Sequence, residues 1–335
     1  MKQLLLSIAT LLLIGVISSC RRDRPPRVDH IQVHLPLFRF EQDLFSLANN
    51  PDRQEVHQLA KKYSDFFWFY FEEFGLNDTT AGWPDSILHY VSDTLLRSLY
   101  DSVQRQFPDL KATQQQLHRM MQYFRFYFPT TPVPAIVTLI NGPGRSAFTY
   151  GDTLLCISLD DYLGPHSRFY RHRDIPRYLL RRFRPEYMLS HCSHVWITQL
   201  YPFSPFGRRL LDAMIYNGKV LYVKSRVLPH LPDSIITEFR QADLEWCRRN
   251  EPLIWKFFLD HDLLYEHDLL EYLKFVTDGP NTSGMPPEAP GNIGTWVGWR
   301  IVSAYMKKNP NVTLSQLMEE QDAQKILDGA AYKPR

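Results

Sequence analysis

The chain has 335 residues, with 38 lysines and arginines against 36 aspartates and glutamates, so its formal net charge is +2. A hydrophobic content of 44%, with 14% aromatic residues, excludes a disordered or collagen-like chain and is ample for a hydrophobic core. A net charge near zero provides no general attraction to nucleic acid or to anionic lipid. After the first 20 residues, no apolar stretch of the sequence is long enough to span a bilayer as a helix.

The N-terminus has the pattern of a secretory signal. Lys2 precedes a nearly unbroken apolar stretch, residues 4–17, which has the length of a signal-peptide core rather than of a transmembrane helix. The stretch ends in Ile17-Ser18-Ser19-Cys20, which resembles a bacterial lipobox. We therefore predict that residues 1–19 are a lipoprotein signal peptide and that Cys20 is lipidated, since acyl chains there would anchor the protein in a membrane. The alternative is an ordinary secretory signal with a coincidental cysteine.

A basic, proline-containing segment follows. Residues 21–27 contain four arginines and two prolines, which cannot build a core and favour extended backbone. We expect residues 20–40 to be the lipidated cysteine and a tether, with residues 41–335 as a single globular domain. The arginines would either lie against lipid head groups or form a solvated spacer. Because the run is not acidic, as export tags to the cell exterior are, we expect an outer-membrane anchor that faces the periplasm.

The rest of the chain predicts an α+β fold that is mostly α-helical with a small β-sheet. Helices are expected over residues 41–48, 53–74, 83–107, 111–128, 186–200, 208–228, 233–249, 251–260, 266–276 and 295–308, with a last helix from Thr313. Strands are expected over residues 133–140, 147–150 and 153–159, with a hairpin turn at residues 141–144. We expect this sheet to pack against the helix that carries His191. Gly294 and Gly298 predict a close approach of backbones along the late helix.

Some polar and cysteine residues have an ordinary structural explanation. Asp160 and Asp161 follow a predicted strand, where paired aspartates bind a metal or transfer protons in some proteins but more often cap a turn. Cys156, Cys192 and Cys247 remain after Cys20. Three cysteines allow at most one disulfide, and we expect at least one of them to be buried and unpaired.

Four segments carry a resemblance to a known family. They are CISLDDYLG (156–164), SHCSH (190–194), MIYNGKVLY (214–222) and PGNIGTWVGWRIV (290–302). In their order and wording they resemble the GldB-type gliding-motility lipoproteins, as do residues 322–334 at the end of the chain. The resemblance implies a cell-envelope lipoprotein that is needed for movement over surfaces, is associated with the gliding and type IX secretion machinery and has no established enzymatic activity.

The same segments resemble a degenerate form of the zinc-peptidase plan, which implies a zincin-like, more narrowly gluzincin-like, fold. In such peptidases two histidines one helical turn apart bind zinc, a glutamate beside the first histidine activates water, and a later Glu-Gly pair supplies the third ligand. Here His191 and His194 are three residues apart, Cys192 stands where the catalytic glutamate would be, and Asn217 occupies the third-ligand position.

The zinc-peptidase resemblance leaves two functional classes open. Because the catalytic glutamate and the third ligand are both replaced, we expect a pseudo-peptidase without enzymatic activity, metal or other cofactor, in which His191, His194 and Asn217 are vestiges. Its partners would be the membrane, through Cys20, and envelope proteins, with no nucleic acid. The alternative is a divergent zinc-dependent metallohydrolase that uses His191, His194 and Cys192, because histidines at i and i+3 share one helix face. The sequence names no small-molecule ligand, although the cleft would suit a peptide or a glycan.

Overall fold

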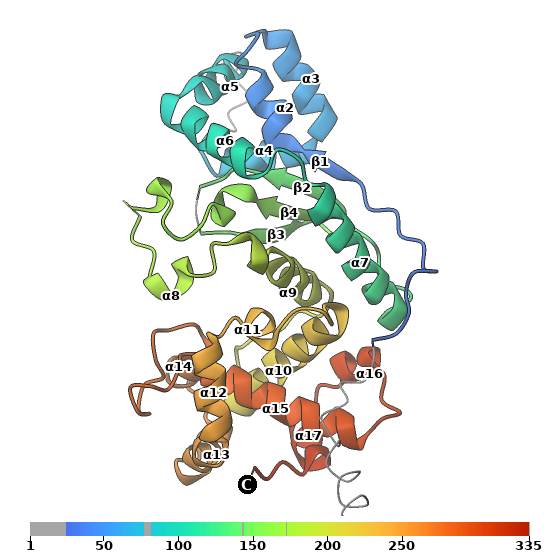
Figure 1. The fold of residues 1–335 in the computed structure, drawn as a ribbon, viewed down its shortest axis with the longest axis vertical. Coiled ribbons are helices and arrows are strands. Elements are labelled where there is room, and N and C mark those ends of the chain that lie inside the picture. The colour runs from blue at the N-terminus through green and yellow to red at the C-terminus, as the bar shows by residue number, and fades with distance from the viewer. Residues whose placement is uncertain (1–24, 77–81, 143, 172, 335) are drawn as a thin grey trace, which may run out of the picture.

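The computed structural model describes residues 25–76, 82–142, 144–171 and 173–334. The predicted signal peptide and Cys20 lie outside these residues. Within them the chain is mostly helical and contains one four-stranded sheet, which confirms the α+β class (Figure 1).

The helices fall into two groups along the chain. Those before or beside the sheet are α2 (Phe40–Ser46), α3 (Arg53–Tyr63), α4 (Asp65–Glu72), α5 (Trp83–Ser92), α6 (Thr94–Gln106) and α7 (Lys111–Tyr127). Those after it are α8 (Arg177–Leu180), α9 (Met188–Leu200), α10 (Leu210–Val227), α11 (Asp233–Ile236), α12 (Gln241–Arg249), α13 (Glu251–Asp260), α14 (Leu269–Val276), α15 (Ile293–Lys308), α16 (Leu314–Glu319) and α17 (Ala323–Ala330). Among the described residues the short 3-10 helices are η2 (Leu159–Tyr162), η3 (Arg168–Tyr170), η4 (Pro185–Tyr187) and η5 (Leu263–Tyr265).

The sheet is mixed, with the order β1-β2-β4-β3. Its strands are β1 (Leu37–Arg39), β2 (Ala135–Leu139), β3 (Ala147–Tyr150) and β4 (Leu154–Ser158). β1 and β4 pair with β2 in parallel, and β3 pairs with β4 in antiparallel orientation. The central strands β2 and β4 are buried along most of their length, which suits their nearly continuous apolar sequences.

The hairpin predicted at residues 141–144 is wrong. β2 and β3 are not neighbours, because β4 lies between them. After β2 the chain passes beyond the position of β4 before it forms β3. The hairpin is formed instead by β3 and β4, and its turn follows Tyr150, where Gly151 has a positive φ of 55°. Sequence periodicity identified the strands but could not order them.

The predicted tether ends too late in the sequence. Val28 and Leu35 are buried, and residues 37–39 form the edge strand β1. The segment also bonds to α7, where the Gln122 amide donates to the Ile31 carbonyl at 2.9 Å. The apolar side chains that follow the basic cluster pack into the hydrophobic core, so residues 28–40 belong to the folded body.

Three of the predicted helices are interrupted. The helix expected over residues 53–74 breaks at Ser64, which has a φ of 48°, and the one expected over 83–107 breaks at Asp93, whose carboxylate caps α6. The helix expected over 233–249 becomes α11 and α12, separated by residues 237–240. A continuous amphipathic pattern conceals such breaks, because the residues on both sides still face the same core.

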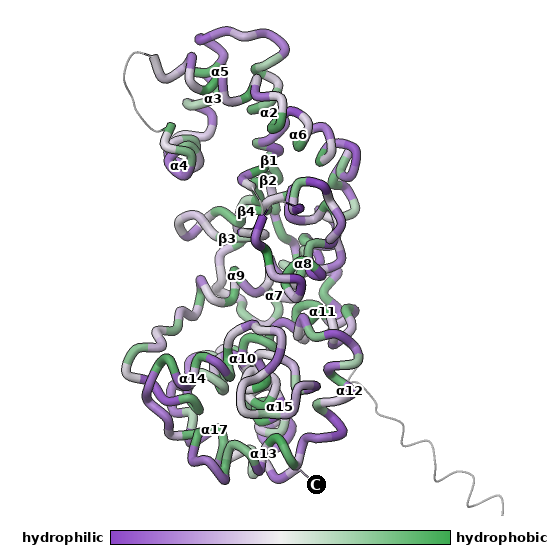
Figure 2. The backbone as a smooth tube through the Cα atoms, turned by 90° about the vertical axis from the view of Figure 1, so that its left-hand side faces the viewer, coloured by the Kyte–Doolittle hydropathy of each residue, from purple (hydrophilic) through white to green (hydrophobic). Residues whose placement is uncertain are grey.

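The elements form successive levels along the molecule. Helices α2–α6 lie at one end, the sheet and α9 lie in the middle, and α10–α17 form the other end (Figures 1 and 2). Helix α9, which carries His191, packs against β3 and β4, as predicted. Within the described ranges, no helix combines the length and apolar character that crossing a membrane requires.

The C-terminal group is built on the close contact of α10 with α15. A methyl group added at Gly298 would overlap the backbone of Met214, and one at Gly294 would lie 2.8 Å from the Phe275 carbonyl oxygen. The close approach predicted from Gly294 and Gly298 is therefore confirmed.

Candidate functional site

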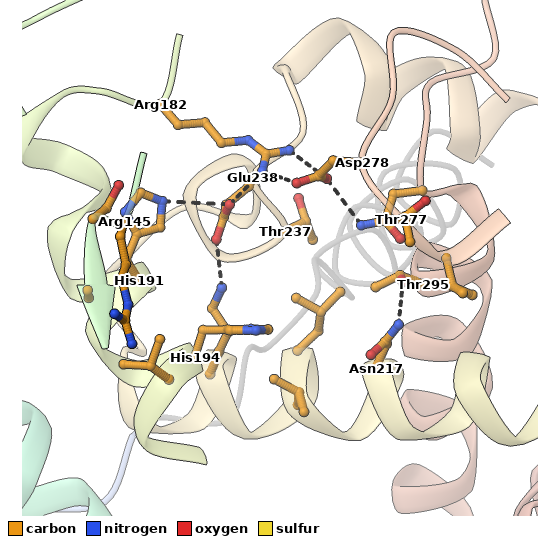
Figure 3. Close-up of a pocket in the computed structure, with 18 of the residues that line it drawn as sticks. Arg145, Arg182, His191, His194, Asn217, Thr237, Glu238, Thr277, Asp278 and Thr295 are labelled. Atoms are coloured by element: carbon orange, nitrogen blue, oxygen red, sulfur yellow. Dashed lines mark hydrogen bonds and ion pairs between the residues drawn. The ribbon is translucent and has the colours of Figure 1, made fainter. Parts of the chain in front are cut away.

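A polar pocket of about 550 Å³ lies where α9, α10 and α15 meet the loops that precede α12 and follow α14 (Figure 3). His191, His194 and Asn217 all line it, so the structure brings the three sequence candidates into one cavity. Helix α9 places the two histidines one turn apart, and α10 supplies Asn217. In Figure 3, Asn217 lies across the pocket from His191.

Glu238 is the central charged residue of the pocket and was missed by the sequence analysis. Its carboxylate accepts a hydrogen bond from the Lys224 ammonium at 3.1 Å and forms an ion pair with Arg182 at 3.0 Å. Burial alone would raise the pKa of Glu238, but the charges of Lys224, His191 and Arg182 hold it well below its usual value. Glu238 has a φ of 60° in the loop between α11 and α12, a conformation that is unusual for glutamate.

Lys224 and Arg182 provide the positive charges around this carboxylate. The Lys224 side chain is only 1% exposed, and burial lowers its pKa while Glu238 opposes that shift. Arg182 makes a bidentate pair with Asp278, at 2.6 and 2.9 Å, in addition to its contact with Glu238. Asp278 also accepts from the Asn292 amide at 3.3 Å. The carboxylates of Glu238 and Asp278 are therefore matched by two buried or nearly buried cations, Lys224 and Arg182.

The two histidines of α9 have different surroundings. The Nδ1 atom of His191 is 3.0 Å from the Tyr162 hydroxyl, and its Nε2 atom is 3.7 Å from Glu238. His194 opens onto the pocket, where its side chain is exposed to solvent. A neutral His194 at neutral pH can offer one donor and one acceptor to a ligand.

The remaining sequence candidates serve the scaffold. The Asn217 amide donates to the Thr295 hydroxyl of α15 at 3.1 Å, which links α10 to α15. The Asp161 carboxylate accepts from the Gly144 amide at 3.0 Å and from the Ser146 hydroxyl at 2.6 Å, so it holds the loop before β3. Asp160 is fully buried, and desolvation followed by the charge of Asp161 raises its pKa. The contacts of Asp161 agree with the turn-capping interpretation, whereas both carboxylate oxygens of Asp160 are buried without a hydrogen-bond partner in the described part of the chain.

The pocket contains side chains of the types that bind metal ions. Considering the described parts of the chain, no group of three or more His, Cys, Asp or Glu side chains is arranged to hold a metal ion. Cys192 is buried without a disulfide, like Cys156 and Cys247, and burial raises its pKa to about 12. Cys192 is not among the residues that line the pocket, so it does not join His191 and His194 there.

One signal in the sequence pointed to the missed residues. Lys224 lies seven residues after Asn217, which places both on one face of α10, among the apolar residues of a helix that is otherwise buried. A lysine on a buried face requires a counter-charge. Its partner was not predictable, because Glu238 was assigned to the interior of a continuous helix.

The fold and the pocket define a mostly helical α+β protein with a charge-compensated polar cavity between its sheet and its C-terminal helices. The model of the family described as gliding motility protein GldB matches residues 21–334. The chain therefore belongs to this lipoprotein family, which confirms the resemblance found in the four segments. Membership implies an association with gliding motility. No curated protein and no solved structure matches the chain.

Proposed function

We propose that the protein is a non-catalytic cell-envelope lipoprotein of the gliding machinery, or an accessory to that machinery and to type IX secretion. Lipid on Cys20 would anchor it to the outer membrane, facing the periplasm, and its pocket would bind a partner or ligand. The lipobox-like sequence at residues 17–20 and the family membership support the anchor.

The compensation of Glu238 by Lys224 and Arg182 is the observation that carries the non-catalytic role. Zinc hydrolysis requires three protein ligands, an open position for water and a base within reach of that water. A zinc ion held by His191 and Glu238 would lie beside the ammonium and guanidinium groups that already neutralise this carboxylate. The repulsion among these cations disfavours a dication, so the residues present do not fit a catalytic zinc site.

We also propose a distant relation to gluzincin-like peptidases. Its support is the order of elements around the pocket: the antiparallel pair β3 and β4 precedes α9 with its two histidines, and α10 with Asn217 follows. In this interpretation an ancestral metal site has become a purely protein-based charge network.

The metallohydrolase remains the second candidate, because His191 and His194 do share one pocket. Elemental analysis of the purified protein separates the two functions. We expect far less than one zinc per chain and no peptide hydrolysis after zinc is added. One zinc per chain, lost together with hydrolysis in His191→Ala/His194→Ala but not in the control His57→Ala, would establish the enzyme instead. His57 is exposed on α3, at the other end of the molecule.

A further inference from the structure

The segment between η2 and α9 is strongly basic. Residues 168–184 contain seven arginines and a single acidic residue, Asp174. Figure 1 shows this segment looping out beside the sheet, with α8 at the left edge of the molecule. Arg171, Arg173, Arg177 and Arg184 are exposed, and none of them has an ion-pair partner among the described residues. So many uncompensated charges in one segment attract anions.

A second pocket, of about 410 Å³, lies at the inner side of this segment. Four arginines line it against two aspartates: Arg177, Arg181, Arg182 and Arg240 face Asp243 and Asp278. Each aspartate is already bonded to one arginine, since Arg182 pairs with Asp278 at 2.6 Å and Arg240 with Asp243 at 2.6 Å. The pocket therefore retains two positive charges without a carboxylate partner.

Two adjacent arginines of this pocket, the uncompensated Arg181 and the paired Arg182, have unused hydrogen-bond donors. Arg181 donates to the backbone carbonyl of Glu238 and to no carboxylate within the described ranges. Burial and the adjacent charge of Arg182 lower the pKa of Arg181, so its charge lies in an unfavourable environment. Arg182 is buried, and its Nε–H has no acceptor in the described part of the chain. An anion in the pocket would relieve the repulsion between these neighbours.

We propose that this second pocket binds a phosphate group of a larger ligand. Guanidinium groups bind phosphate through paired N–H donors, and the several oxygens of a phosphate can satisfy Arg177, Arg181 and Arg182 together, whereas a carboxylate offers only two oxygens. A cavity of about 410 Å³ exceeds the size of a phosphate ion and has the volume of a site for a small organic molecule. The exposed arginines of the segment would guide the anion toward it.

Binding to the purified full chain, measured by calorimetry at fixed ionic strength, tests this proposal. Inorganic phosphate and glucose 6-phosphate report a free phosphate group, and phosphatidylglycerol vesicles compared with phosphatidylcholine vesicles report a lipid-linked one. The test variants are Arg177→Gln and Arg177→Gln/Arg181→Gln. The matched control is Arg171→Gln/Arg173→Gln, which loses the same charge as the double variant but lies outside the pocket.

We expect saturable binding of at least one phosphate-bearing probe. Arg177→Gln, at an exposed residue, should keep its fold and weaken binding about tenfold, and the double variant up to about a hundredfold, since each charged hydrogen bond contributes this much to affinity. The control should change by less than about threefold, because its charges act at longer range through screened solvent. Equal losses in control and test variants, or no saturable binding of any probe, would overturn the proposal.

Discussion

The ammonium group of Lys224 lies 3.1 Å from the carboxylate of Glu238, and this lysine side chain is almost completely shielded from solvent. The pair joins α10 to the loop between α11 and α12, so a single contact connects the packing of the C-terminal helices to the shape of the pocket. Arg182 approaches the same carboxylate from the arginine-rich segment. The pocket thus depends on charges supplied by three separate parts of the chain.

Glu238→Gln is expected to destabilise the protein more than Lys224→Met/Glu238→Gln. Removing the carboxylate leaves a buried ammonium without its counter-charge, which costs about 3–5 kcal/mol, whereas replacing both members of a buried pair is often nearly neutral. Urea unfolding of Lys224→Met, Glu238→Gln and the double variant measures the coupling between the two residues. If the change in the free energy of unfolding of the double variant equals the sum of the changes of the two single variants, Lys224 and Glu238 do not stabilise each other.

Asp160→Asn is expected to stabilise the protein at pH 8 and to have little effect at pH 4. The raised pKa of Asp160 means that the folded state holds its proton more tightly than the unfolded state does. The stability that protonated Asp160 contributes is fully present below about pH 4, the pKa of aspartate in the unfolded chain. It is lost as the pH rises through the higher pKa of Asp160 in the folded protein. Asparagine is neutral throughout and avoids this loss.

Melting temperatures of wild type and Asp160→Asn between pH 4 and pH 8 check this expectation. The difference should grow with pH and reach a few degrees, since about 1 kcal/mol corresponds to roughly 2–4 °C in a large domain. Asp93→Asn is the control, because Asp93 is an exposed helix cap on α6. A variant at Asp160 that is less stable than wild type at pH 8 would show that the buried carboxylate is needed in its charged form.

The sequence predicted the elements better than their connections. Strands β2, β3 and β4 follow from local patterns, because alternating or continuous apolar residues are determined within a few positions. The parallel pairing of β2 with β4 depends on where the chain returns after several residues, which no local pattern specifies. The addition of β1 from the predicted tether depends on the same kind of long-range contact.

The site was predictable only in part, for a related reason. His191, His194 and Asn217 were identified through the resemblance of their segments to the zinc-peptidase plan, and the structure does bring them to one pocket. Glu238, Arg182 and Asp278 lie in loops or short helices, and their roles arise from contacts across long sequence distances. Charge compensation between such residues is a property of the folded chain, so no local pattern in the sequence reveals it.

Gly298→Ala is expected to destabilise the protein strongly. The added methyl group would overlap the backbone of Met214, so α10 and α15 would have to separate along their contact. Overpacking in a core typically costs about 1–3 kcal/mol, and a clash with backbone belongs at the upper end of that range or above it. Gly82→Ala is the control, because nothing lies within 4 Å of a methyl group there. Thermal unfolding that is unchanged in Gly298→Ala would contradict the close helix contact.

Cys20→Ala is expected to release the protein from the membrane. The sequence before Cys20 matches a lipobox, and among the four cysteines it alone stands in that context. Cys156, Cys192 and Cys247 are buried in the folded body and cannot take its place as sites of lipid attachment. Acyl chains on one residue supply the hydrophobic anchoring, so their loss should remove the protein from the membrane fraction and abolish its labelling with radioactive palmitate.

Ser18→Ala is the control, since it keeps a small residue near the cleavage site and should remain labelled and membrane-bound. A Cys20→Ala protein that still takes up palmitate and sediments with membranes would show that the anchor lies elsewhere in the chain.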